Sequence, residues 1–143
     1  IPTPRWVCVK NPSEVELLND WNLFPAVVKP ATGGSSVGLK VAKDSHGLKK
    51  YALSLSQRFG KVLIEEFVEG REFTCGFAGG KIFTPLEISP KKGLYDFETK
   101  YTKGLAQFKP VHGTLGEKIK SLTARVVEAL EIENLCRVDF RYK

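Results

Sequence analysis

Apolar residues in the first half of the chain fall into compact runs separated by one stretch of helical repeat. Residues 24–29 form an apolar run that ends at Pro30, which predicts a buried strand. Asp44 or Ser45 begins a predicted helix whose apolar residues lie on one face, and Gly60 ends it. The other elements expected here are a short helix at residues 13–19, opened by a capping box at Ser13, and strands at residues 39–41 and 61–66.

The second half of the chain begins with a hairpin pattern and ends with a helix and a strand. Two apolar runs at residues 73–78 and 81–83 flank a Gly-Gly pair, which is typical of a two-residue hairpin turn. Residues 89–113 show no sustained period and are too long for a passive connection, which favours a functional loop. A helix at residues 117–130 and a strand at residues 135–142 complete the order.

The order of these elements predicts an α+β fold with two small lobes, residues 1–70 and 71–143. The 143 residues are 42% hydrophobic and 27% charged, which excludes the disordered, collagen-like and coiled-coil classes. No apolar run approaches the roughly 20 residues of a membrane span, so a cytoplasmic protein with no membrane partner is expected. The chain contains no Met and begins at Ile1, so we expect a segment upstream of it.

The cysteines and histidines show no pattern of a metal or nucleophilic site. Cys8, Cys75 and Cys136 lie far apart in sequence without metal-ligand spacing, so reduced thiols are expected. His46 and His112 have no neighbouring thiol or carboxylate pattern and are interpreted as ordinary surface residues. The net charge of +6 suits a polyanionic partner, but charge alone does not separate a nucleotide from a nucleic acid.

Lys29 stands at the end of an apolar run, where an unpaired ammonium would be costly to bury. It is followed at residues 33–38 by the loop GGSSVG, whose missing side chains let backbone N–H groups approach a ligand and whose hydroxyls donate to phosphate oxygens. Together they favour a phosphate clamp. Two simpler interpretations stay open: Lys29 extends to solvent, and the loop is an ordinary turn, since it lacks the Gly-Lys-Ser/Thr ending of a Walker loop.

Three carboxylates in the apolar strands are candidates for chemistry. Glu65 and Glu66 are consecutive in a strand and point to opposite faces, so they cannot flank one bond and a glycosidase is disfavoured. Asp139 lies on an apolar strand with Arg137 two positions away on the same face. Asp139 therefore either forms a salt bridge with Arg137 or holds Mg²⁺, and the sequence leaves both interpretations open.

Five motifs follow one another along the chain: FPAVVKPA at 24–31, GGSSVG at 33–38, VLIEEFVEGREF at 62–73, YDFETKY at 95–101 and RVDF at 137–140. In this order they resemble the motifs of D-alanine:D-alanine ligases of the ATP-grasp superfamily. The resemblance implies an ATP-grasp fold of two small α+β lobes with the nucleotide cleft between them, the C-terminal lobe being incomplete. It also implies an enzyme that activates the carboxylate of one D-alanine as an acyl phosphate with ATP. The amine of a second D-alanine then attacks to give a dipeptide for peptidoglycan.

The resemblance assigns roles to individual residues. Lys29 would neutralise the ATP phosphates, and the loop carrying Ser35 and Ser36 would close over them and the substrate. Arg137 would stabilise the tetrahedral oxyanion, and Asp139 would ligate Mg²⁺, or Mn²⁺ in its place. An adenine-facing hinge is implied at Glu65, Glu66, Phe67 and Val68, and Glu72 would bind the ribose. Lys100 and Tyr101 would lie on the long loop that closes the site. Tyr101 would be one of the catalytic residues.

The chain also departs from the family pattern. Phe97 stands where the family often has Tyr, and the sequence stops at Lys143, before the Glu-x-Asn strand that carries further metal ligands. We expect the domain that precedes these motifs in the family to lie outside these 143 residues. We therefore expect ATP and D-alanine as ligands, no turnover by this chain alone, and a homodimer for the full-length protein.

Two other interpretations remain open from the sequence. Another ATP-grasp ligase would use D-lactate or D-serine as the second substrate. A basic nucleic-acid-binding module is suggested by lysines interleaved with aromatic residues, namely Lys91, Lys92, Lys100, Lys103 and Lys109 with Tyr95, Phe97, Tyr101 and Phe108.

Overall fold

The structure is a computed structural model that describes residues 1–34, 36–90 and 106–143. The chain forms two compact units, one of Thr3–Phe67 and one of Val68–Lys143 together with Ile1–Pro2. Each unit has its own sheet and its own buried core. The assignment of residues 1–70 and 71–143 as two functional lobes stays a prediction. No helix in the described part of the chain has the length and apolar character needed to span a membrane.

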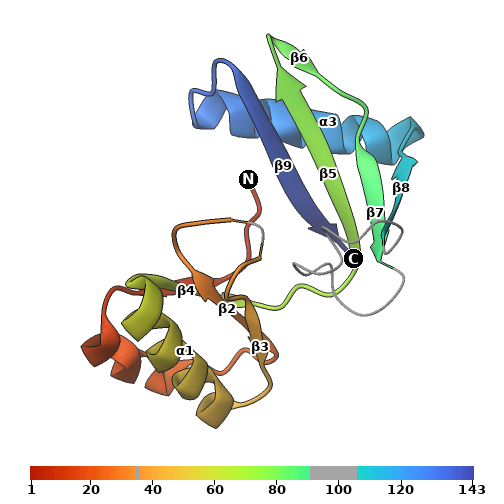
Figure 1. Cartoon of the computed structure of the whole chain (residues 1–143). Coiled ribbons are helices and arrows are strands. Elements are labelled where there is room, and N and C mark those ends of the chain that lie inside the picture. The colour runs from red at the N-terminus through yellow and green to blue at the C-terminus, as the bar shows by residue number, and fades with distance from the viewer. Residues whose placement is uncertain (35, 91–105) are drawn as a thin grey trace. The chain divides into compact units, whose positions relative to one another are not determined.

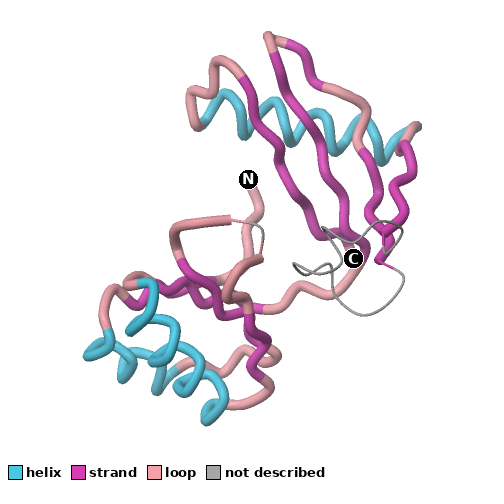
Figure 2. The backbone as a smooth tube through the Cα atoms, in the orientation of Figure 1, coloured by secondary structure: helices cyan, strands magenta, loops and turns pink. Residues whose placement is uncertain are grey.

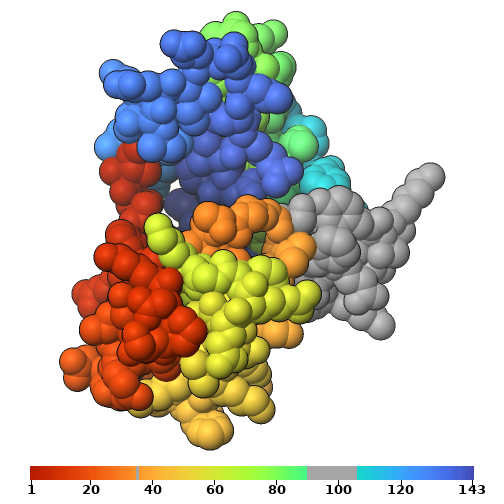
Figure 3. All heavy atoms as spheres, turned by 60° about the vertical axis from the view of Figure 1, so that its left-hand side comes forward, coloured from red at the N-terminus to blue at the C-terminus, as the bar shows by residue number. Residues whose placement is uncertain are grey.

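The unit of Thr3–Phe67 is a four-stranded antiparallel sheet in the order β1-β4-β2-β3. Helix α1 (Ser45–Phe59) and the 3-10 helix η1 (Pro12–Asp20) cover one face of this sheet (Figures 1 and 2). In the space-filling view the red atoms of η1 lie beside the yellow atoms of α1 (Figure 3). The strands are β1 (Trp6–Val9), β2 (Ala26–Pro30), β3 (Lys40–Ala42) and β4 (Val62–Glu66).

Alternating strand residues supply the core of this unit. Val28 on β2 and Ile64 on β4 are opposite each other in the register and are fully buried against the helices, as period-two alternation requires. The predicted helix at 44–60 is confirmed: the Gly47 N–H donates to the Asp44 carboxylate at 2.7 Å, and Gly60 is the C-cap. The buried residues are Val9, Val15, Leu18, Ala26, Val28, Ala42, Leu48, Ala52, Leu55, Val62 and Ile64.

The short first helix begins earlier than the capping box predicted. Its N-cap is Asn11, whose side-chain oxygen accepts the Ser13 N–H at 3.1 Å, so the assignment of Ser13 as the cap is wrong. Glu14 accepts the backbone N–H of Lys10 at 2.8 Å. Pro12 explains the shift, because proline has no N–H to leave unsatisfied and its fixed φ suits the first helical position.

The second unit is a five-stranded antiparallel sheet built around β5. Strand β9 pairs along the whole of β5, while β6 and β7 pair with the other side of β5, and β8 pairs with β7. Figure 1 shows helix α3 (Gly113–Ala129) running across one face of this sheet. The strands are β5 (Arg71–Ala78), β6 (Lys81–Ile82), β7 (Leu86–Pro90), β8 (Ala106–Pro110) and β9 (Leu135–Tyr142).

Two of the predicted elements of this unit are confirmed and two need correction. The hairpin turn falls at Gly79 and Gly80, both with positive φ, and the last strand is β9 as predicted. Strand β8 lies inside the stretch 89–113 that was expected to be loop. Its residues are mostly exposed and show no apolar alternation, so no local pattern indicated a strand there. Helix α3 also begins at Gly113, before the predicted start at residue 117.

Candidate functional site

Lys29 and Glu65 form an ion pair on the face of the first sheet that lies opposite the helices. Val27 pairs with Glu65 and Lys29 pairs with Leu63, so the two charged side chains are diagonal neighbours across β2 and β4. The Lys29 side chain remains 37% exposed and that of Glu65 19% exposed. Lys29 therefore has Glu65 as its anionic partner and a partly exposed side chain, and its role at ATP phosphates stays a prediction.

Glu66 lies on the other face of the same strand. It pairs with Ala26, which is fully buried on the helix-covered side of the sheet, so Glu65 and Glu66 point to opposite faces as predicted. The backbone N–H of Glu66 donates to the carbonyl of Arg5 at 2.9 Å, and that of Phe67 donates to the carbonyl of Pro25 at 3.0 Å. Contacts from Glu66 or Phe67 to a ligand would thus use carbonyl groups or side chains.

The glycine-serine loop has open space beside its first two glycines. A Cβ built on Gly33 or Gly34 would meet nothing within 4 Å, so another molecule can approach the backbone there. Ser36 adopts a left-handed conformation with φ of 59°, and its carbonyl accepts the Leu39 N–H at 3.1 Å. Ser35 lies outside the described residues, as do Lys100 and Tyr101. The roles predicted for these three residues stay predictions.

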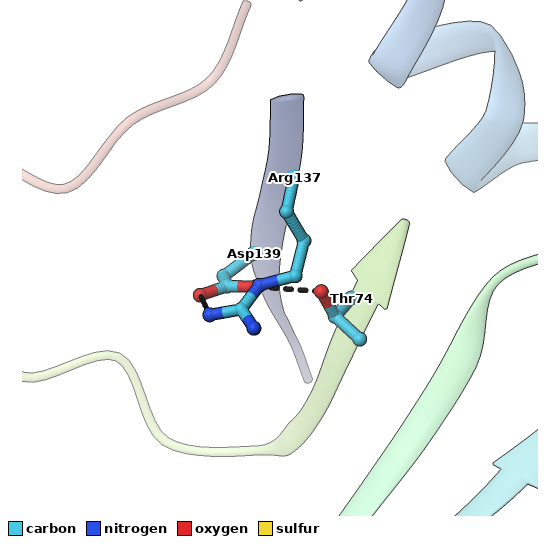
Figure 4. A network of polar contacts seen from close by, with 3 residues as sticks. All are labelled: Thr74, Arg137 and Asp139. Carbon is cyan, nitrogen blue, oxygen red and sulfur yellow. Dashed lines mark hydrogen bonds and ion pairs between the residues drawn. The ribbon is translucent and has the colours of Figure 1, made fainter. Parts of the chain in front are cut away.

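Thr74, Arg137 and Asp139 form a polar cluster on the second sheet (Figure 4). Thr74 lies directly opposite Asp139 in the β5–β9 register, and its hydroxyl donates to Asp139 Oδ1 at 2.7 Å. Arg137 Nε donates to the same oxygen at 3.1 Å, and Arg137 Nη2 reaches Oδ2 at 3.4 Å. The ion pair between Arg137 and Asp139 is thus present, and the metal role of Asp139 stays a prediction. The Arg137 and Asp139 side chains remain 60% and 45% exposed, so both are accessible to a ligand.

Glu72 lies on the same face of β5 as Thr74 and forms an ion pair with Arg141 at 3.1 Å. Arg141 also donates to the Gly70 carbonyl at 3.3 Å. The face of the second sheet away from α3 thus carries charges of alternating sign, with Glu72 and Asp139 set beside Arg141 and Arg137. Such a face can neutralise an anion and offer a carboxylate to a cation at the same time.

The opposite face of the same sheet carries a separate ion pair. Arg71 donates to both carboxylate oxygens of Glu87, at 2.8 and 2.6 Å, and its guanidinium lies 5.0 Å from the centre of the Phe73 ring. The hydrogen bonds from Arg71 lower the pKa of Glu87, and the pKa of Arg71 is raised in turn. This pair joins β5 to β7 and was not predicted, because it depends on a strand pairing that the sequence did not indicate.

The described residues offer a partial metal site. No group of three or more His, Cys, Asp or Glu side chains that could hold a metal ion occurs within residues 1–34, 36–90 and 106–143. Mg²⁺ is commonly held by one or two carboxylates, with water and substrate phosphates completing its octahedron. Asp139 fits this pattern as a single ligand through Oδ2, whose one contact within the described part of the chain is the long one from Arg137.

The three cysteines are free thiols, and none belongs to these polar groups. Cys75 faces α3 in the core of the second unit, and its burial raises the pKa of the thiol. Its thiol donates to the Phe83 carbonyl at 3.4 Å. A buried thiol with a raised pKa is a poor nucleophile, so Cys75 is interpreted as a core residue.

Comparison with known proteins identifies the family. Residues 1–143 match the family model described as D-ala D-ala ligase C-terminus. The chain belongs to this ligase family. It is 43% identical to the D-alanine–D-alanine ligase of Aquifex aeolicus, covering 99% of this chain and 48% of the relative. It is 32% identical to D-alanine–D-alanine ligase B of Clostridium perfringens, covering 97% of this chain and 47% of that protein.

Solved structures of ligases share the fold. The D-alanine–D-alanine ligase of Bacillus anthracis superposes on the whole chain with a TM-score of 0.76 and 29% identity, and the chain covers 48% of it. The D-Ala:D-Ser ligase VanG of Enterococcus faecalis gives a TM-score of 0.79 at 23% identity, which supports the fold alone. The predicted α+β fold of ATP-grasp type is therefore confirmed. The chain spans about half the length of the ligases it matches.

Proposed function

We propose that this chain is the ATP-binding part of a D-alanine–D-alanine ligase, whose whole form joins two D-alanines through an acyl phosphate for peptidoglycan synthesis. The observation that carries the proposal is the family match over all 143 residues. A structural neighbour from Bacillus anthracis, 25% identical with a TM-score of 0.73, was solved in complex with ATP. The ligase family favours this function over the basic nucleic-acid-binding module.

Lys29 supplies positive charge for the triphosphate in this proposal. Its ion pair with Glu65 restrains a long side chain that would otherwise sample many rotamers, while 37% exposure leaves the ammonium accessible. The open backbone at Gly33 and Gly34 admits phosphate oxygens to N–H groups of the loop. Phosphoryl transfer depends chiefly on positioning and charge neutralisation, so no nucleophilic side chain is required.

Arg137 and Asp139 act at the reacting carboxylate and phosphate. Arg137 would stabilise charge on the tetrahedral oxyanion, and its ion pair with Asp139 would restrain the orientation of the guanidinium. When bound, Mg²⁺ or Mn²⁺ neutralises charge on the phosphates, and Asp139 is the described residue that would hold it. We propose that residues of both units, Lys29 in the first and Asp139 in the second, contact the same ATP.

The finer properties of the whole protein follow the same family assignment. We propose a cytoplasmic homodimer that uses ATP, Mg²⁺ and D-alanine. With a single metal carboxylate among its described residues, this chain by itself is expected to bind Mg-ATP weakly and not to turn over.

Stabilisation by Mg-ATP tests the nucleotide assignment. Mg-ATP should raise the melting temperature of the chain, since a ligand that binds only the folded state stabilises it. The shift should disappear in Lys29→Ala and persist in Lys43→Ala, which removes an exposed lysine of the same unit. A shift caused instead by an oligonucleotide, with a steep salt dependence, would support the nucleic-acid-binding module.

Phosphate release by the full-length protein that carries this chain tests the substrate. Release of phosphate from ATP should require D-alanine and should be accompanied by formation of ADP and the dipeptide. Release that does not depend on D-alanine would remove the assigned substrate while leaving an ATP-grasp ligase. Equal activity with D-lactate or D-serine as the second substrate would support the alternative that the chain belongs to an ATP-grasp ligase with that second substrate.

A further inference from the structure

Thr74 makes a short contact that neither the sequence motifs nor the assigned roles include. It lies in the middle of β5 between Phe73 and Cys75, both packed in the core against α3. Its own side chain points to the opposite face and is only 8% exposed. A hydroxyl held this firmly on a paired strand has little freedom to reorient, so its position is set by the core behind it.

The hydroxyl of Thr74 distinguishes the two oxygens of Asp139. Oδ1 accepts from Thr74 at 2.7 Å and from Arg137 Nε at 3.1 Å, whereas among the described residues Oδ2 accepts from Arg137 Nη2 alone, at 3.4 Å. Oδ1 thus has two protein donors, whereas Oδ2 has one long contact and is the oxygen more available to a cation. Figure 4 shows the Thr74 and Arg137 side chains converging on the carboxylate from adjacent strands.

We propose that Thr74 is a positioning residue that fixes the Asp139 carboxylate so that Oδ2 is presented to a divalent metal ion. The proposal rests on the proposed function, because it concerns the metal that accompanies ATP. Its physical basis is that partners behind a ligating carboxylate orient it and change metal affinity by about 10- to 100-fold when removed. Thr74 touches neither metal nor substrate in this role.

The proximity of Arg137 explains why the Asp139 carboxylate needs a second hydrogen-bond partner, Thr74, to fix its orientation. A guanidinium and a carboxylate two residues apart on one strand can form a bidentate pair that engages both carboxylate oxygens. Arg137 already reaches both oxygens of Asp139, at 3.1 and 3.4 Å. Without the Thr74 hydroxyl on Oδ1, this pair would be free to tighten, and Oδ2 would be drawn further toward Arg137 and away from a cation. Arg137 would at the same time be withdrawn from the oxyanion. Thr74 therefore keeps two neighbouring groups of opposite charge available for separate tasks.

The test uses Mn²⁺ as the probe in the full-length protein that carries this chain. Thr74→Val keeps the shape and removes the hydroxyl, and Thr74→Ser keeps the hydroxyl. Two quantities are measured: the melting shift that Mn²⁺ adds to the ADP-bound protein, and the Mn²⁺ concentration that half-saturates phosphate release. Thr84→Val is the matched control, because Thr84 is exposed and lies outside the cluster.

Thr74→Val should require about tenfold more Mn²⁺, with the affinity for ADP in EDTA unchanged. Thr74→Ser and Thr84→Val should behave as the wild type. Unchanged Mn²⁺ dependence in Thr74→Val would overturn the proposal, and so would equal weakening in Thr74→Val and Thr74→Ser, since the hydroxyl would then not be the cause. If Thr74→Val does not fold, Thr74→Ala replaces it, and failure of both to fold assigns a structural role and overturns the proposal.

The same measurements separate this inference from the proposed function. If the wild type shows neither a Mn²⁺ shift with ADP nor D-alanine-dependent phosphate release, the ligase function itself fails. If the wild type shows both and Thr74→Val matches it, only the role of Thr74 fails.

Discussion

Single residues of this chain act mostly through pairs that bridge strands. The ion pair of Arg71 and Glu87 is an example, in which both carboxylate oxygens of Glu87 accept hydrogen bonds from the Arg71 guanidinium. The Glu87 side chain is 21% exposed and that of Arg71 55% exposed, so solvent screens the pair. Its contribution is therefore expected to be small, as for other solvent-exposed ion pairs.

The pH dependence of stability tests this pair. The pKa of Glu87 is lowered in the folded state, first by its hydrogen bonds to Arg71. Its contribution is therefore fully present above the ordinary glutamate pKa and is lost as the pH falls through the lowered value. Melting temperatures should show Glu87→Gln less stable than the wild type at neutral pH, with the difference vanishing in acid. In an Arg71→Gln background the same substitution should have little effect, and a persistent difference would assign the effect to another contact.

At the scale of elements, close backbone approach explains one glycine of α3. A Cβ on Gly116 would lie 2.5 Å from the carbonyl oxygen of Val111, a residue that packs on the core of the second unit. Gly116→Ala should lower the free energy of unfolding by about 1–3 kcal/mol, although alanine normally favours a helix by about 1 kcal/mol. Denaturant unfolding measures this change.

Gly47, in the first turn of α1, is the matched control. A Cβ there would come no closer than 3.3 Å, to the Asp44 carboxylate. Gly47→Ala is expected to change the free energy of unfolding by less than about 1 kcal/mol. Equal destabilisation by both substitutions would show that the Val111 contact is not the cause.

Elements whose signals are local were predicted well from the sequence. Helix α1 begins after its N-cap Asp44 and ends at its C-cap Gly60, and the β5–β6 turn consists of Gly79 and Gly80. Each of these boundaries is determined by residues that are adjacent in the sequence. Strand β8 has mostly exposed residues and forms because β7 is beside it. Its existence depends on a partner distant in sequence, which a local pattern does not encode.

In the candidate site, too, contacts between residues close in sequence were predicted, and contacts between distant strands were not. Arg137 and Asp139 are two residues apart on one strand, and their pairing followed from strand alternation. The contacts of Lys29 with Glu65 and of Thr74 with Asp139 join strands far apart in the sequence. They require the register of the sheets, so the sequence indicated Lys29, Glu65 and Asp139 separately and missed Thr74.

For the whole molecule, the proposed function requires two separately folded units to serve one ligand. Lys29 belongs to the unit of Thr3–Phe67 and Asp139 to the other. Both would neutralise charge on the same triphosphate, one directly and one through the metal. Substitutions at sites that share no partner usually add within about 0.3–0.5 kcal/mol, so a departure from additivity would indicate a common ligand.

A double-mutant cycle on Mg-ATP affinity in the full-length protein tests this coupling. Lys29→Ala and Asp139→Asn should each weaken binding by about tenfold. Loss of the metal carboxylate leaves more negative charge on the phosphates, so Lys29 becomes more important and the double variant should lose at least about twofold more than the product of the single losses. The control cycle combines Lys29→Ala with Glu87→Gln, which should be additive. Additivity in both cycles would show that Lys29 and Asp139 do not act on one nucleotide.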